Sequence, residues 1–180
     1  MAHCILNVNA KVQGLGNYSS SIIEVINVLY ENEIGIIQLP CPEMTIYGVK
    51  RWGHVKEQFD TPHFREQCQQ IIRPVVDQLK DYTKNNYRIV GVIGVDGSPS
   101  CGVGKTCSGN WGGEIAGRQD LTDVVNNVKC IKQPGVFMEE LQELFSKNNI
   151  DVPFTAVDEI NAVQSINRIR VLIKENIKHQ

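Results

Sequence analysis

The chain has 180 residues, of which 42% are hydrophobic and 21% charged, proportions that indicate one globular domain and exclude a disordered or fibrous protein. A formal charge of -2 and a pI near 6.1 provide no basic field for nucleic acid. No apolar run has the length of a membrane span and the N-terminus shows no targeting pattern, so we expect a cytoplasmic protein with neither nucleic-acid nor membrane partners.

The first part of the chain predicts a strand, a helix and a second strand. Residues 1–6 predict a very short strand, and the β-branched run 33–40 predicts a buried strand that its final proline ends. Between them, the spacing of apolar residues predicts a helix over 21–32, with Ser21 and Glu24 as a capping box at its start. The expected buried face of this helix consists of Ile22, Ile26, Leu29 and Tyr30.

The middle of the chain predicts a long helix and then the clearest strand. Thr61 is the expected N-cap and Pro62 the first helical residue, and Pro74 is expected to bend the helix. Residues 88–96 are almost continuously apolar, as expected for a parallel strand covered on both faces. The apolar stripe of the helix consists of Phe64, Cys68, Ile71, Val75, Leu79 and Tyr82.

The last part begins with a Gly-rich segment, 102–133, which we interpret as a long loop or lid with a short strand at 128–132. A helix over 136–147, a strand over 152–157 and a final helix from Asp158 follow. The apolar stripe of the final helix consists of Ile160, Val163, Ile166, Ile169, Ile173 and Ile177.

Strands therefore alternate with helices, which is the pattern of parallel strands joined by right-handed crossovers. We expect a single α/β domain over 1–180, with 102–133 as an inserted loop or lid. Its sheet is expected to be small, open and mainly parallel, with about four strands flanked by helices in a Rossmann-like arrangement.

Three of the cysteines lie at or just beyond expected strand ends: Cys4, Cys41 and Cys101. Ligands of an open parallel sheet bind outside the carboxyl ends of its strands, so these thiols are expected to meet at one edge. Their spacing matches no zinc-ribbon or ferredoxin pattern, but three thiolates suit a soft metal or an iron–sulfur cluster with one coordination position open. The alternative is that they are small buried side chains, a common place for free cysteine.

The other three cysteines have different expected places. Cys68 lies on the stripe of the long helix and Cys130 lies among apolar residues, so both are expected in the core. Cys107 follows in the Gly-rich segment and would either supply a fourth ligand or lie on a mobile loop.

The run VDGSPSCGVGKT, residues 95–106, raises the question of a phosphate-binding loop. Gly104, Lys105 and Thr106 supply the end of that motif, but Pro99 occupies the position of its first glycine and lacks an N–H group. The match fails, and we expect the glycines to give backbone room beside a metal centre.

With HCILN at its start, CPE after the second expected strand and SPSCG after the third, the chain resembles the bacterial family related to thiouracil desulfidase over residues 1–110. The resemblance implies a [4Fe-4S] cluster bound by Cys4, Cys41 and Cys101, whose fourth iron binds the sulfur of a substrate. It also implies a desulfidase of sulfur metabolism, a hydrolase that converts a small thiocarbonyl compound, such as a thiouracil-like heterocycle, and releases hydrosulfide.

The same resemblance gives roles to residues beside the cluster. Glu43 would activate a water that attacks the thiocarbonyl carbon, and Ser100 would relay a proton, with Ser98 as a weaker candidate. The segments CPEMTIYGVKRWG and KTCSGNWGGE depart from the family pattern where substrate is expected, and the first strand is unusually short. These departures leave the identity of the substrate open.

Several of these residues also have a structural interpretation. Glu43 would otherwise be a solvated loop charge, and Ser100 a turn residue. The tryptophans in the two divergent segments would either stack on a flat heterocycle or pack the loops. The basic residues in these segments would either hold an anionic ligand or be solvated. Two histidines are expected on the surface. These residues are Trp52, Trp111, Arg51, Lys105, His54 and His63.

Two other classes of function remain open from the sequence. A cluster or metal site closed by Cys107 would make the chain a non-catalytic electron carrier or sensor, because no iron would be free for substrate. A metal-free redox protein would use Cys101 and Cys107 as its thiols.

Overall fold

A computed structural model describes residues 1–177; the last three residues of the expected domain lie outside this range. The helices are α1 (His3–Leu6), the short 3-10 helix η1 (Val8–Ala10), α2 (Ile23–Glu31), α3 (Pro42–Tyr47), α4 (Lys56–Phe59), α5 (Pro62–Lys84), α6 (Thr122–Asn126), α7 (Val136–Lys147) and α8 (Ala162–Ile177). The strands are β1 (Val92–Val95), β2 (Thr106–Ser108), β3 (Lys129–Ile131) and β4 (Phe154–Val157).

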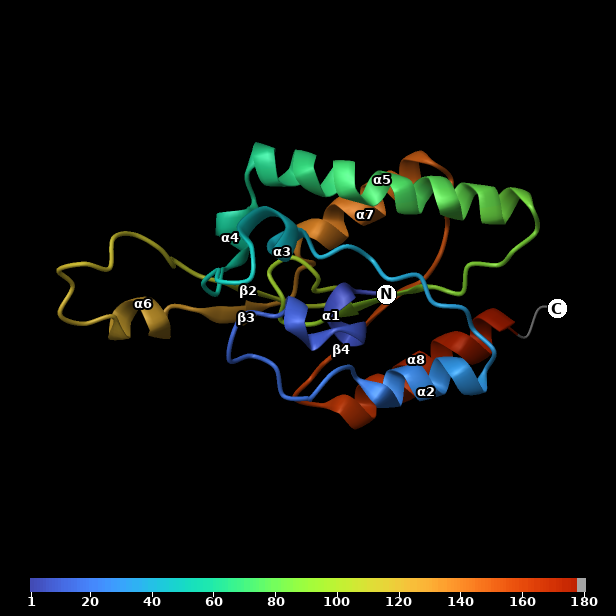
Figure 1. The fold of residues 1–180 in the computed structure, drawn as a ribbon, viewed down its shortest axis with the longest axis horizontal. Coiled ribbons are helices and arrows are strands. Elements are labelled where there is room, and N and C mark those ends of the chain that lie inside the picture. Colours follow the sequence, from blue (N-terminus) through green and yellow to red (C-terminus); the bar gives the residue numbers. More distant parts are fainter. Residues whose placement is uncertain (178–180) are drawn as a thin grey trace.

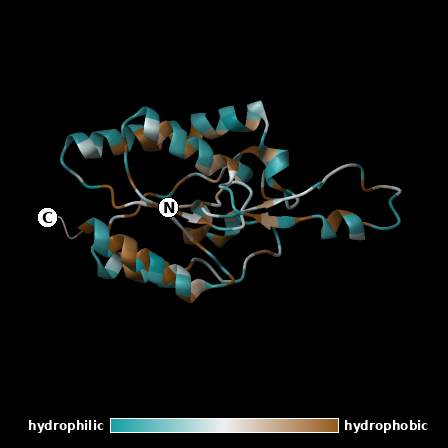
Figure 2. Ribbon diagram, turned by 180° about the vertical axis from the view of Figure 1, so that it is seen from behind, coloured by the Kyte–Doolittle hydropathy of each residue, from teal (hydrophilic) through white to brown (hydrophobic). Residues whose placement is uncertain are grey.

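The elements form a layered α/β arrangement, as the alternation of strands and helices predicts. β1 pairs with β4 in parallel, from Val92 opposite Phe154 to Val95 opposite Val157. Figure 1 shows α5 and α7 on one side of this pair and α2 and α8 on the other. In Figure 2 the strands are largely brown while α5 alternates teal and brown, as expected for a helix that covers a core on one side only.

The expected sheet of about four strands is not confirmed, because the described residues form two sheets of two strands each. The segment expected as the first strand contacts β1 through a hydrogen bond from Ala2 N to Ile93 O (2.8 Å). It contacts the segment expected as the second strand through two main-chain bonds, from Leu39 N to Met1 O (2.8 Å) and from the Met1 amino group to Ile37 O (2.6 Å). The chain turns into α1 at His3, so the N-terminal segment is too short to form a ladder.

The start and face of α2 differ from the prediction. Its N-cap is Ile22 and no side chain caps it, so the capping box of Ser21 and Glu24 is wrong. Tyr30 is 81% exposed, whereas Val25 and Val28 are buried. The helix is rotated relative to the expected stripe because the face that it presents to α8 is centred on those valines.

The other long elements follow the sequence closely. α7 has the expected bounds, and β1 and β4 lie within the predicted strands. α5 begins as predicted, and its most buried positions include Ile72 and Val76, one residue beyond the expected Ile71 and Val75. This small rotation results from the packing of α5 against α7.

The final helix begins later than predicted. Asp158 forms a turn instead, because its Oδ1 accepts a hydrogen bond from Ile160 N (3.1 Å) and its carbonyl accepts one from Asn161 N (3.0 Å). Ile160 and Val163, expected on the buried stripe, are therefore 97% and 74% exposed.

The Gly-rich segment 102–133 contains more structure than the single strand expected. β2 and β3 pair antiparallel, and α6 lies in the connection between them. Figure 1 shows this connection extending well away from the layered body. Its role as a lid stays a prediction. Among the helices of residues 1–177, none combines the length and apolar character that a membrane crossing requires.

The start of α5 provides a test of the fold. Thr61 Oγ1 accepts a hydrogen bond from Phe64 N (3.2 Å), so Thr61→Ala is expected to lower the free energy of unfolding by about 1 kcal/mol. Thr61→Ser keeps the acceptor and is expected to retain most of that stability in urea titrations. Equal loss in both variants would contradict a capping role.

Candidate active site

The three cysteines expected to meet are carried by three different elements. Cys4 lies in α1, Cys41 is the N-cap of α3, and Cys101 follows β1 in the SPSCG turn. Cys41 and Cys101 are buried and Cys4 is half-buried. Burial raises the pKa of Cys4 to about 12, and the pKa of Cys101 is raised well above its usual range, first by burial and then by the charges of Cys4 and Cys41. The structure thus brings the three thiols into one electrostatic neighbourhood.

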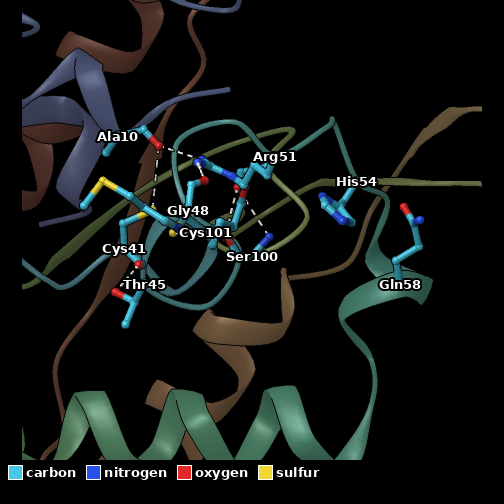
Figure 3. A network of polar contacts seen from close by, with 12 residues as sticks. Ala10, Cys41, Thr45, Gly48, Arg51, His54, Gln58, Ser100 and Cys101 are labelled. Atoms are coloured by element: carbon cyan, nitrogen blue, oxygen red, sulfur yellow. Dashed lines mark hydrogen bonds and ion pairs between the residues drawn. The ribbon is translucent and has the colours of Figure 1, made fainter. Parts of the chain in front are cut away.

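Polar groups lie close to two of the sulfur atoms. Met44 N donates to Cys41 Sγ over 3.4 Å at the start of α3, and Ser100 Oγ lies 3.5 Å from Cys101 Sγ. The labelled Cys41 and Cys101 lie side by side in Figure 3. Hydrogen bonds to sulfur are one of the means by which proteins adjust an iron–sulfur cluster.

The SPSCG turn is fixed by the first turn of α7. Val136 N donates to Pro99 O (3.0 Å) and Met138 N donates to Ser100 O (3.1 Å). This approach requires Gly135, because a Cβ at that position would lie 2.5 Å from Ser100 O. The helix start and the turn therefore hold Cys101 in place together.

A buried carboxylate lies directly beside Cys101. Ser100 Oγ donates to Glu43 Oε1 over 2.5 Å, and Arg51 Nε donates to Glu43 Oε2 over 3.2 Å (Figure 3). Glu43 is only 8% exposed, so it is not a solvated surface charge. Ser98 Oγ performs the turn function considered for Ser100, since it accepts hydrogen bonds from Ser100 N (3.3 Å) and Cys101 N (3.0 Å).

Arg51 connects this carboxylate to the surrounding chain. It is 8% exposed, and its remaining bonds run from Nη2 to Ala10 O (2.6 Å) and from Nη1 to Gly48 O (3.1 Å). The expectation of a solvated or anion-binding arginine is therefore wrong, because the guanidinium is consumed by an internal ion pair and two carbonyls. The only feature of the sequence that points to the pairing of Arg51 with Glu43 is that both residues lie in the same divergent segment.

The GVGK turn does not offer its amides to phosphate. Asp96 Oδ1 accepts hydrogen bonds from Val103 N (3.1 Å), Gly104 N (2.9 Å) and Lys105 N (3.3 Å). A carboxylate of the chain thus fills the position that an anion takes in a phosphate-binding loop. Lys105 Nζ pairs with Asp158 Oδ2 at 2.7 Å, so its charge is balanced within the chain.

A cavity of about 360 Å³ opens next to the network, and Arg51 lies in its wall. Trp52 and Trp111, expected to stack a heterocycle or pack the loops, both line it. Trp111 Nε1 donates to Gly53 O over 3.0 Å, which fixes the second indole against the loop of the first. Aromatic rings among the lining residues suit a planar ligand.

His54 belongs to this cavity and not to the surface, so the expectation for it is wrong. Its ring stacks on Tyr47 (5.0 Å between centroids) and on Phe59 (4.8 Å), and burial lowers its pKa. Nδ1 of His54 is buried without a hydrogen-bond partner among residues 1–177. Gln58 also lines the cavity, on the other side of His54 from Arg51 in Figure 3. His63 is exposed, as expected.

The remaining cysteines lie apart from the three. Cys68 is fully buried in α5, which confirms its place in the core, whereas Cys130 is exposed and its expected core position is wrong. Cys107 is half-buried, with Sγ 3.3 Å from His54 O. Its main charge interactions are with Glu43, Glu57 and Cys130. The structure places Cys107 beside His54 and opposite Cys130, and its use as a fourth ligand stays a prediction.

The donor set fits a cluster better than a single ion. Within the described part of the chain, no group of three or more His, Cys, Asp or Glu side chains converges as one metal ion requires. A cluster sets a different requirement, because each cysteine ligates its own iron and the sulfurs need to surround the cofactor without converging on one point. The charge of Cys101 interacts with those of Cys4 and Cys41, and Cys41 Sγ accepts an N–H hydrogen bond, which is compatible with this looser requirement.

Comparison with known proteins places these residues in a family. A family described as "Putative 2-thiouracil desulfurase" matches residues 16–117, a range that contains Cys41, Glu43, Ser100 and Cys101 but not Cys4. The chain is also 40% identical over 105 residues to the uncharacterized protein MJ0003 of Methanocaldococcus jannaschii, covering 58% of this chain and 67% of that protein. No solved structure matches significantly. Since that relative is archaeal, the family is not confined to bacteria as the sequence resemblance had it. The chain belongs to the 2-thiouracil desulfurase family.

Proposed function

We propose that the chain is a desulfidase that hydrolyses the C=S bond of a small thiocarbonyl heterocycle and releases hydrosulfide. The observation that carries this proposal is the position of Arg51, which lines the aromatic cavity and binds Glu43 Oε2 in the network beside Cys101. A planar ligand in the cavity would therefore contact Arg51, the direct partner of the carboxylate. The family match supports the class of reaction.

Cys4, Cys41 and Cys101 are the residues that would hold a [4Fe-4S] cluster. Such a cluster with three cysteine ligands supplies one iron without a protein ligand, and that iron is a Lewis acid for a thiocarbonyl sulfur. The protein supplies burial, which excludes bulk water, and the N–H and O–H groups near two of the sulfurs.

Glu43 and Ser100 are placed for the proton transfers of hydrolysis. Glu43 takes a proton from the water that attacks the thiocarbonyl carbon, and Arg51 balances its charge in the buried site. The hydroxyl of Ser100, bonded to the same carboxylate and 3.5 Å from Cys101 Sγ, passes a proton towards the departing sulfur. The balance is one water consumed, C=S converted to C=O, and one molecule of hydrogen sulfide formed.

The cavity supplies recognition of the heterocycle. Trp52 and Trp111 provide flat apolar contact area. The imidazole of His54 and the amide of Gln58 line the same cavity and offer hydrogen bonds to a ring N–H or carbonyl. The edge of a thiopyrimidine carries both kinds of group, so it matches this wall in shape and in polarity.

The proposal is tested by reconstituting the protein anaerobically, measuring iron and labile sulfide, and then assaying hydrosulfide release from 2-thiouracil. Cys101→Ser is expected to lose the iron and the activity, whereas Cys130→Ser, at an exposed cysteine, is expected to retain both. Iron retained in Cys101→Ser would contradict the assignment of the ligands. Fully loaded protein that releases no hydrosulfide from any thiopyrimidine offered would contradict the reaction.

Removal of an indole from the cavity tests the substrate site. Trp52→Ala is expected to raise KM for 2-thiouracil by about 2- to 10-fold with little change in kcat, since stacking contributes about 0.5–1.5 kcal/mol in ground and transition states alike. Tyr30→Ala removes an exposed aromatic of α2 and serves as the control. An unchanged KM in steady-state assays of the Trp52 variant would place the substrate elsewhere.

A further inference from the structure

Two cysteines outside the candidate active site are cross-strand neighbours. In the β2–β3 ribbon, Cys107 lies directly opposite Cys130. Residues opposite each other in an antiparallel pair point to the same face, with Cα atoms about 4.5 or 5.5 Å apart according to the type of pair. Disulfides form across Cα separations of about 4.4–6.8 Å. The backbone register alone therefore brings these two thiols within bonding range.

The two thiols differ in their surroundings. Cys130 is exposed, lies between Lys129 and Ile131 in β3, and is close enough to Lys105 to affect its titration. Exposure to solvent gives small-molecule reagents access to a thiol. Cys107 is half-buried, and burial raises its pKa to about 11. One member of the pair is thus open to small molecules and the other is sheltered.

We propose that Cys107 and Cys130 are a redox pair that closes to a reversible disulfide by exchange with a low-molecular-weight disulfide. The Cys130 thiolate attacks the small disulfide, forms a mixed disulfide and expels one small thiolate. Cys107 then attacks Cys130 Sγ, forms the cross-strand bond and expels the second. The two protein thiols lose two electrons and two protons, and the small disulfide gains them as two thiols.

The pair is mechanically connected to the aromatic cavity. Cys107 Sγ lies 3.3 Å from the carbonyl of His54, whose ring lines the cavity, and the next residue, Ser108, binds Glu57 of α4. Bonding Cys107 to Cys130 directs its sulfur across the ribbon and away from His54. The disulfide also ties together both ends of the connection that carries Trp111. The pairing itself does not depend on the desulfidase proposal.

The test uses the full chain under anaerobic conditions with glutathione disulfide as the probe. After exposure, free thiols are alkylated and the peptides are mapped by mass spectrometry. The wild-type protein is expected to give a Cys107–Cys130 linked peptide that dithiothreitol releases. Cys107→Ser is expected to stop at the mixed disulfide, with one glutathione on Cys130, because its resolving thiol is absent. Cys130→Ser is expected to acquire neither the link nor glutathione on Cys107.

Three results would overturn the proposal, and none depends on enzyme activity. In the first, the wild-type protein stops at a glutathionylated Cys130. In the second, Cys107 forms a disulfide with Cys101 instead of Cys130. In the third, Cys130 forms a disulfide with Cys130 of a second molecule. Non-reducing gels separate the last result from an internal link. Cys68→Ser, which removes a buried thiol of α5, controls for general changes in thiol number and is expected to form the link as wild type does.

Discussion

Replacement of Glu43 by glutamine is expected to lower the rate of hydrosulfide release from 2-thiouracil by about 10²–10⁴-fold. Glutamine has nearly the same shape, but it does not take up the proton of an attacking water. The iron and sulfide content is expected to stay at the wild-type level, because the side chain of Glu43 bonds to Ser100 and Arg51 and the substitution leaves its backbone unchanged. The measurement is kcat/KM in protein of matched iron content. Activity within threefold of wild type would remove Glu43 from the reaction.

A smaller change at Ser100 separates proton transfer from structure. Ser100→Ala deletes the hydroxyl but leaves the ion pair of Glu43 with Arg51 in place. A hydrogen bond to a charged group contributes about 1.5–3 kcal/mol, so a loss of roughly 10- to 100-fold is expected. Glu66→Gln, at an exposed carboxylate of α5, is the matched control and is expected to be silent. Equal activity of Ser100→Ala and wild type would show that the hydroxyl only supports the turn.

The sequence signal for the cysteine site is local. An almost unbroken apolar run marks β1, and whatever follows such a strand lies at the edge of the sheet, so the position of Cys101 follows. Cys41 is placed correctly although its preceding segment forms no ladder, since Pro42 and Glu43 begin α3 immediately afterwards. The expected grouping of the three thiols does not depend on the number of strands, and it stays a prediction.

What the sequence does not disclose depends on contacts between distant segments. Arg51 is buried because Ala10, forty-one positions earlier, presents a carbonyl to it. His54 is half-buried because Tyr47 and Phe59 stack on it from two helices. Cys130 has apolar neighbours in sequence, but it lies in a strand of three residues on a protruding ribbon and is therefore exposed. A strand of this length is too short for an alternation of apolar and polar residues to show which side chains are exposed. Each error concerns the environment of a side chain, which only the packed chain determines.

Replacement of Arg51 by methionine is expected to destabilise the fold by about 3–5 kcal/mol, because it leaves the Glu43 carboxylate buried without its counter-charge. The side chains of the pair are only 3% and 10% exposed, so water does not replace the lost partner without a rearrangement. The carbonyls of Ala10 and Gly48 lose their donors as well. The measurement is the free energy of unfolding from urea titration of the variant and of wild type under the same reducing conditions.

A double variant distinguishes this cause from simple loss of packing. Arg51→Met combined with Glu43→Gln removes both charges, so no unpaired carboxylate remains and much of the stability is expected to return even though two residues are changed. Arg170→Met, at an exposed arginine of α8, is expected to change the stability by less than about 0.5 kcal/mol. The double variant still lacks the carboxylate, so it is expected to be as inactive as Glu43→Gln alone. Additive destabilisation in the double variant would show that Arg51 stabilises the loop by its volume and carbonyl bonds, and that the buried charge of Glu43 needs no counter-ion there.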